Sequence, residues 1–149
     1  MNRGKILSLC LIAAVCLCTL GCGGDADPRY EPIKKLMADQ TKIFKNTTEG
    51  LNKAENAGEI AAVLNQWAED MRGLFPRFRE HSELLSKLKE MDPPIELQAV
   101  NMELERALRE MNEASVRIQS YQDDPQVQAG QRNLLEVMEE LKEIDPSLK

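Results

Sequence analysis

Residues 56–88 read NAGEIAAVLNQWAEDMRGLFPRFREHSELLSKL, and apolar side chains recur in this stretch at alternating steps of four and three. Residues three and four apart are neighbours on a helix surface, so this spacing places the apolar residues on one side. The stretch therefore predicts a long amphipathic helix with one buried face. The expected buried positions are Ile60, Leu64, Trp67, Met71, Leu74, Phe78, His81, Leu85 and Leu88.

Two local signals shape this helix. Asn56, followed three residues later by Glu59, forms a capping box that predicts the helix start. Pro76 lies inside the pattern and should kink the helix, at a cost of about 3 kcal/mol unless the bend is used. We expect one bent helix, because the apolar spacing continues through the proline. Two shorter helices broken at Pro76 are the alternative.

Three further amphipathic patterns lie on either side of this stretch. The first, beginning near Pro28 or Pro32, has its expected buried face at Ile33, Met37, Gln40, Phe44, Thr47, Leu51 and Ala54. The third helix is expected to bury Leu97, Val100, Leu104, Ala107, Met111, Ala114, Ile118 and Tyr121. The fourth is expected to bury Val127, Gly130, Leu134, Val137, Leu141 and Ile144.

The boundaries of these helices are marked by Asp-Pro pairs. An aspartate can cap a helix whose first residue is proline, and such pairs stand at residues 27–28, 92–93 and 124–125. The pair at 145–146 marks the end of the fourth helix. Short loops favour antiparallel neighbours. The predicted fold class is therefore all-α, an up-down-up-down antiparallel four-helix bundle over residues 28–149, with unequal helices, after an N-terminal signal peptide.

The first 21 residues are typical of a secretory signal peptide. Arg3 and Lys5 precede a mostly apolar stretch from Ile6 to Leu20, which the small residue Gly21 follows. This stretch is too short for a membrane span, which needs about 20 apolar residues. Residues 1–21 are therefore predicted to be removed on export.

Thr19-Leu20-Gly21-Cys22 resembles the lipobox that the lipoprotein signal peptidase of bacteria cuts, although that family usually has Leu where this chain has Thr19. The resemblance implies that Cys22 is acylated and becomes the new N-terminus, with residues 22–27 as a lipidated tether. Gly23 stands where an Asp often signals inner-membrane retention in that family, so the periplasmic face of the outer membrane is favoured if the host has two membranes. Ordinary cleavage nearby and an uncleaved anchor are the alternatives.

Charge and cysteine content agree with an exported acidic domain. Removal of residues 1–21 leaves 17 basic against 25 acidic residues, a net charge of −8, which disfavours nucleic acid as a partner. Cys10, Cys16 and Cys18 lie inside the removed segment, so Cys22 is the one cysteine of the mature chain. Packing alone, without an intramolecular disulfide, must then hold the domain.

The unequal helix lengths predict an open end. The fourth helix is too short to cover the second, which leaves the residues near the tether with only three helices around them. We expect an apolar groove there that takes a ligand or a partner. Its candidate residues are Met37, Phe78, His81, Leu85, Leu88 and Leu104.

Residues 53–57, Lys-Ala-Glu-Asn-Ala, are similar to the first interhelical turn of soluble b-type cytochromes, in which Met and His side chains bind haem. Aligned through that turn, Thr41 occupies the family's axial Met position, and the last helix has no histidine. We therefore expect no cofactor, and expect His81 to cap the opening or to bond a neighbouring carboxylate.

Other chemistry finds little support in the sequence. One histidine cannot supply the paired Glu-x-x-His motifs of di-iron bundles, and one mature cysteine gives no zinc-site spacing. We expect no metal site and no catalytic residues. The sequence favours a non-enzymatic, membrane-anchored lipoprotein that binds an unknown protein partner or has a structural role in the envelope. The alternative is a carrier of a small apolar ligand or cofactor in the groove.

Overall fold

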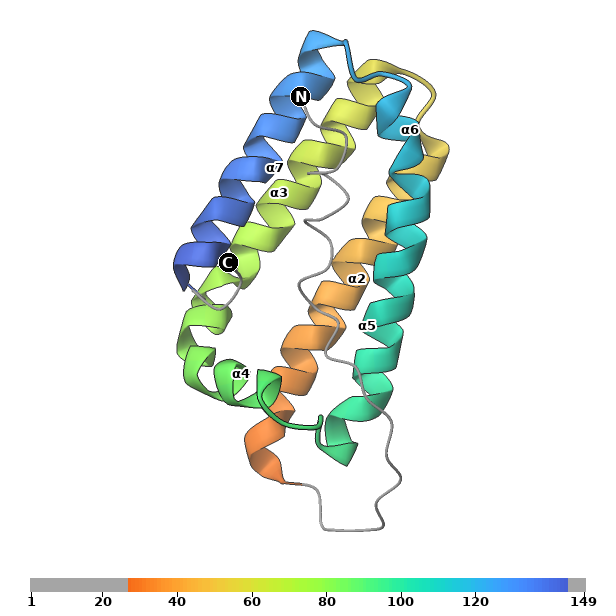
Figure 1. Cartoon of the computed structure of the whole chain (residues 1–149). Helices are drawn as coiled ribbons and strands as arrows, with labels where there is room; N and C mark the ends of the chain where they lie inside the picture. Colours follow the sequence, from red (N-terminus) through yellow and green to blue (C-terminus); the bar gives the residue numbers. More distant parts are fainter. Residues whose placement is uncertain (1–26, 145–149) are drawn as a thin grey trace.

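The computed structural model describes residues 27–144, and every regular element in this range is helical (Figure 1). The elements are a short 3-10 helix η2 (Pro28–Tyr30), α2 (Glu31–Lys53), α3 (Ala57–Glu80), α4 (Ser82–Lys89), α5 (Ile95–Ala114), α6 (Val116–Gln119) and α7 (Pro125–Ile144). The predicted all-α class is confirmed for these residues. The predicted signal peptide, the acylation site Cys22 and the Asp145-Pro146 boundary lie outside the described residues.

The four long helices lie side by side in the order α5, α2, α3, α7 (Figure 1). Close packing joins α2 with both α3 and α5, and α3 with α7. We call the end that holds α4 and the starts of α2 and α5 the α4 end. The opposite end, which holds the α2–α3 turn, α6 and the start of α7, is called the α6 end.

The second predicted helix is divided, and the division is not at the proline. Helix α3 continues through Pro76 to Glu80, and the chain leaves helical geometry at His81, with φ −109° and ψ 12°. The main-chain N–H of His81 donates to the carbonyl of Arg77 at 3.0 Å, which ends α3. Pro76 is tolerated on the solvent-exposed side of the helix. Neither a single bent helix nor a break at Pro76 was therefore right.

Helix α4 takes the chain from α3 to α5, two helices that are not closely packed neighbours. Its eight residues lie across the lower end of the molecule in Figure 1. A short loop between adjacent helices was predicted at this point. Because α4 crosses the end of the molecule, the long helices α3 and α5 can follow one another in the sequence and still be separated by α2.

Most of the predicted helix starts are confirmed. The Asn56 side chain accepts from the Glu59 N–H at 3.0 Å, and the Glu59 carboxylate accepts from the Glu55 N–H at 2.8 Å. Asp27 and Asp124 likewise accept from the main-chain N–H two residues ahead, at 3.0 and 2.8 Å. The Asp92 cap was wrong, because α5 begins at Ile95 with Pro94 before it and no side-chain cap bond.

The helix surfaces that face the interior agree with the predicted spacing, since every predicted position from Ile33 to Ile144 is buried or half-buried. The interior is wider than predicted, because Leu36, Ile43, Phe75 and Leu108 are also buried. The third predicted helix is interrupted at Ser115, which separates α5 from α6.

Three apolar clusters fill the bundle. The central cluster draws on all four long helices and includes Phe44, Met71, Leu104 and Val137. The α6-end cluster comprises Leu51, Ala54, Ile60, Ala61, Leu64, Ala114, Ile118 and Val127. The α4-end cluster comprises Ile33, Leu88 and Leu97.

Trp67 connects two of these clusters. It packs against both the central and the α6-end cluster, and meets the Phe44 ring edge-on, with centroids 6.5 Å apart and planes at 84°. Its indole N–H is buried without a hydrogen-bond partner in the described part of the chain.

Gly130 permits the close approach of α3 and α7. A Cβ atom at this position would lie 3.0 Å from the Leu64 Cβ and 3.4 Å from the Ala61 carbonyl oxygen. A contact of 3.0 Å is too close for a packed interior, so Leu64 or one of the two helices would have to shift. The two helices pack closely here because residue 130 has no side chain.

Candidate functional site

The residues of the predicted groove come together in the fold, but they are buried or half-buried and do not line an open groove. Leu88, on α4, belongs to the α4-end cluster, and the half-buried Met37 and Leu85 pack against it. Leu104, on α5, is buried in the central cluster, and the half-buried Phe78 packs against that cluster together with Met37 and Leu85.

The open groove was wrong for the described residues. Ile33 and Leu97 retain only 0 and 2% of their accessible surface, because α4 folds over them, and Leu88 of α4, which packs with them, retains 9%. The predicted second helix ran straight past the end of α7. The break at His81 instead turns its last eight residues across the bundle, where they supply the missing cover. Whether this end takes a ligand or a partner stays a prediction.

His81 stands where α3 meets α4. Its side chain is largely buried, and its Nε2 lies 3.9 Å from a carboxylate oxygen of Glu80. Its main-chain carbonyl accepts from the Leu85 N–H at 2.9 Å, in the first turn of α4. This arrangement fits a residue that positions α4 and has a carboxylate beside it.

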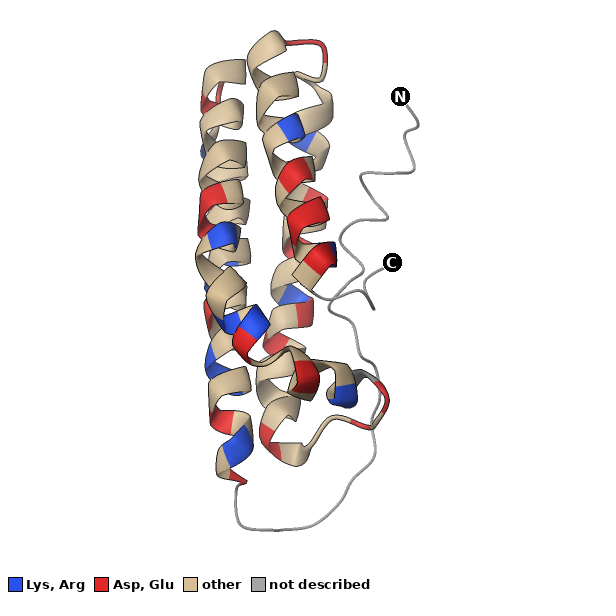
Figure 2. Ribbon diagram, turned by 90° about the vertical axis from the view of Figure 1, so that its left-hand side faces the viewer, with Lys and Arg blue, Asp and Glu red and all other residues tan. Residues whose placement is uncertain are grey.

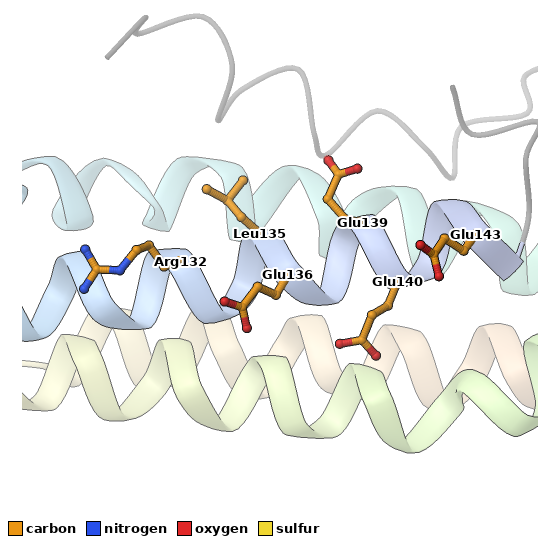
Figure 3. Close-up of a pocket in the computed structure, with 6 residues that line it drawn as sticks. All are labelled: Arg132, Leu135, Glu136, Glu139, Glu140 and Glu143. Atoms are coloured by element: carbon orange, nitrogen blue, oxygen red, sulfur yellow. The ribbon is translucent and has the colours of Figure 1, made fainter.

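An acidic surface covers the outer side of α7. Figure 3 shows a shallow hollow along this helix, lined by Arg132, Leu135, Glu136, Glu139, Glu140 and Glu143. Arg72 of α3 contacts Glu140 at 3.2 Å, and Lys142 contacts Glu139 at 2.8 Å. Within residues 27–144, no group of three or more His, Cys, Asp or Glu side chains could hold a metal ion. The surface is that of a solvated helix with partly paired charges.

The outer face of α5 is different in character. Met102 and Val116 (the latter at the start of α6) are 64 and 59% exposed, which is high for large apolar side chains. Arg106 and Arg109, between them along the same side, are also exposed. Within the described residues, the arginines that form ion pairs are Arg29, Arg72 and Arg77, so Arg106 and Arg109 are not among them.

We call Met102, Arg106, Arg109 and Val116 the α5 face. This face was not predicted, because the spacing of apolar residues describes only the buried side of each helix. The available signal was Met102, a large apolar residue on the side opposite the buried positions Leu104 and Ala107. In Figure 2, blue and red ribbon segments are interspersed along the helices.

The α4 end carries a second exposed apolar pair. Met91 and Ile95, which lie on the loop from α4 and at the first position of α5, are 49 and 51% exposed. The main-chain N–H of Asp27 donates to the Glu96 carboxylate at 3.2 Å, which brings the start of the described chain beside Ile95. Hydrogen bonds from Arg29 hold the pKa of the Asp27 carboxyl below its ordinary value.

Comparison with protein-family models, with curated proteins and with solved structures finds no match for this chain. Among the described residues, no helix is both long and apolar enough to cross a bilayer.

Proposed function

We propose that this protein is an exported lipoprotein, held in the cell envelope by acyl chains on Cys22, whose helical domain binds a protein partner through the α5 face and catalyses no reaction. Its long helices would form an up-down-up-down antiparallel bundle that presents this face as a rigid surface. In a host with two membranes, the periplasmic face of the outer membrane is the proposed location. The observation that carries the partner-binding proposal is the exposure of Met102 and Val116 beside two arginines outside the ion pairs of the described residues.

The chemistry of the α5 face indicates what it would bind. Exposed Met and Arg side chains are enriched at protein interfaces, where they give contact area and directed hydrogen bonds. The two guanidinium groups favour carboxylates in a partner, because arginine pairs with carboxylate in a two-pronged geometry. We therefore propose a protein segment with acidic and apolar side chains on one side, such as an amphipathic helix.

Membrane anchoring is tested by mass. The full-length protein would be extracted in detergent from its own membranes, and its mass measured with and without non-covalent adducts. We expect a chain that begins at Cys22 and carries acyl groups. Cys22→Ser should leave an unprocessed chain without acyl groups. An unacylated native chain would contradict the anchor.

Partner binding is tested with a photo-crosslinking amino acid at position 102, and at Ala62 as the control on the exposed side of α3. We expect one discrete protein adduct from position 102 and none from position 62. Arg109→Glu should abolish the adduct, whereas Arg109→Lys should retain much of it. Circular dichroism would show that both variants remain folded. Equal adducts from both positions, or an adduct that survives Arg109→Glu, would contradict binding through the α5 face.

The same mass measurement tests the carrier alternative. A discrete small-molecule adduct that is lost on Leu85→Glu would favour a carrier, with the ligand held beneath α4. A chain without any such adduct would favour the partner-binding module.

A further inference from the structure

We infer that the α4 end rests on the bilayer, with Met91 and Ile95 inserted at the level of the lipid headgroups. This inference rests on the proposed acylation of Cys22. It adds a second, non-covalent membrane contact and fixes which end of the bundle faces the lipid.

The exit point of the tether is held in place by several hydrogen bonds. Asp27 donates its N–H to Glu96 at 3.2 Å, and its carbonyl accepts from the Tyr30 N–H at 3.1 Å. Its carboxylate accepts from the main-chain N–H of Arg29 at 3.0 Å. The segment toward Cys22 therefore leaves the domain next to the first turn of α5.

The tether is short compared with the bundle. Five residue steps separate Cys22 from Asp27, and a chain extends at most about 3.4 Å per residue, or roughly 17 Å in total. The long helices have 20 to 24 residues, or about 30 to 36 Å at 1.5 Å per residue. An acylated Cys22 in the bilayer therefore keeps the α4 end close to the lipid and allows the α6 end to lie far from it.

The surface at this end is suited to a headgroup layer. Met91 and Ile95 flank Pro93-Pro94, so a stiff loop presents two large apolar side chains about half exposed. Half-exposed apolar groups gain from partial burial in the interface without full insertion.

Charge at this end limits the depth of insertion. Glu90 and Asp92, which are exposed, flank Met91. Two cations at this end, Lys34 and Lys87, pair with Glu31 and Glu83, at 3.4 and 2.6 Å. The contact is therefore apolar and shallow, forms on zwitterionic lipid, and does not depend on anionic lipid or low salt.

The test places a fluorescent probe at single cysteines in the acylated, full mature protein, reconstituted in phosphatidylcholine vesicles. Met91→Cys and Ile95→Cys report on the α4 end, and Val116→Cys, a similarly exposed apolar position, is the matched control at the α6 end. A lipid with a nitroxide near the headgroup serves as the quencher. We expect at least twofold quenching at positions 91 and 95, unchanged in 1 M salt, and little quenching at position 116.

Three results would overturn the inference in distinguishable ways. An acylated, vesicle-bound protein with equal quenching at positions 95 and 116 would show that the bundle has no fixed end on the lipid, and would leave the anchor intact. An unacylated native protein, identified by mass, would overturn the anchor and this inference with it. Protection of positions 91 and 95 in native membranes but not in vesicles would assign them to a protein contact instead, and would also overturn the inference.

Discussion

Both ends of the bundle hold an apolar cluster, but at the α6 end polar side chains also donate to main-chain carbonyls, whereas at the α4 end a crossing helix covers the cluster. The Arg117 guanidinium donates to the carbonyls of Asn52 and Ala54 at 3.2 and 2.5 Å, and the Tyr121 hydroxyl donates to Glu55 at 3.0 Å. The α4 end relies on the α4-end cluster beneath α4.

The helix starts differ in the same way. At the α6 end, α3 and α7 begin with main-chain N–H groups that donate to the side chains of Asn56 and Asp124. At the α4 end, α2, α4 and α5 begin without a side-chain cap bond, and the residues just before them are Tyr30, His81 and Pro94. The starts of α3 and α7 are thus fixed by local sequence, and the starts of α4 and α5 depend on tertiary packing.

The largest expected effect tests whether the α4 end is a packed core. Leu97→Ala should lower the free energy of unfolding by about 2–5 kcal/mol, because a buried leucine loses its transfer energy and leaves a cavity. Leu51→Ala, at the α6 end, is the matched control and should cost a similar amount. Urea denaturation measures both. A loss below about 1 kcal/mol for Leu97→Ala alone would show that the α4 end is not part of the cooperative core.

The polar closure of the α6 end is tested at Arg117. Arg117→Ala should cost about 2 kcal/mol, because two carbonyls lose a charged donor at a partly exposed site. Arg109→Ala, which removes an exposed arginine outside the ion pairs described, should change stability by less than about 0.5 kcal/mol. Thermal unfolding compares the two. Equal effects would mean that the Arg117 bonds do not hold this end together.

The capping difference predicts a smaller effect. Asn56→Ala should cost about 1 kcal/mol, since the Glu59 N–H loses its acceptor at the start of α3. Asn56→Asp keeps an acceptor and should stay close to the native stability. Denaturant midpoints measure both changes. A neutral Asn56→Ala would indicate that water replaces the cap without loss.

The smallest effect concerns the pH response at the tether exit. Because Arg29 lowers the pKa of the Asp27 carboxyl below its ordinary 3.8, the associated stability is present above that pH and is lost as the pH falls through the lowered pKa. NMR titration of the carboxyl carbon should show this, and Arg29→Ala should raise the pKa toward 3.8. Glu83, whose pKa Lys87 lowers, should be unaffected by that change. An unchanged Asp27 titration in Arg29→Ala would contradict the Arg29 contact.

The helices and their buried faces could be predicted because they depend on local spacing. The positions from Ile33 to Ile144 follow steps of three and four, and Asn56 with Glu59 is a local signal. The break at His81 could not be predicted in this way. Pro76 is the stronger local helix breaker. The turn at His81 is favoured because it allows α4 to cover Ile33 and Leu97, which are distant in the sequence.

The candidate surfaces were missed for a related reason. Met102 and Val116 are apolar residues off the buried face, and single exposed apolar residues are common on soluble proteins. Whether they lie beside Arg106 and Arg109 on the surface depends on which side of α5 faces solvent. Likewise, the proximity of Ile95 to the tether depends on the Asp27–Glu96 bond, which spans 69 positions in the sequence.

The placement of Trp67 has a practical consequence. It is the one tryptophan of the chain, and it packs against the central and α6-end clusters but not against the α4-end cluster. Its intrinsic fluorescence therefore follows the loss of those two clusters, while far-ultraviolet dichroism follows all helices together. If the α4 end opens first, dichroism will change at a lower urea concentration than tryptophan emission does. Two coincident curves will instead mean that α4 unfolds with the rest of the bundle.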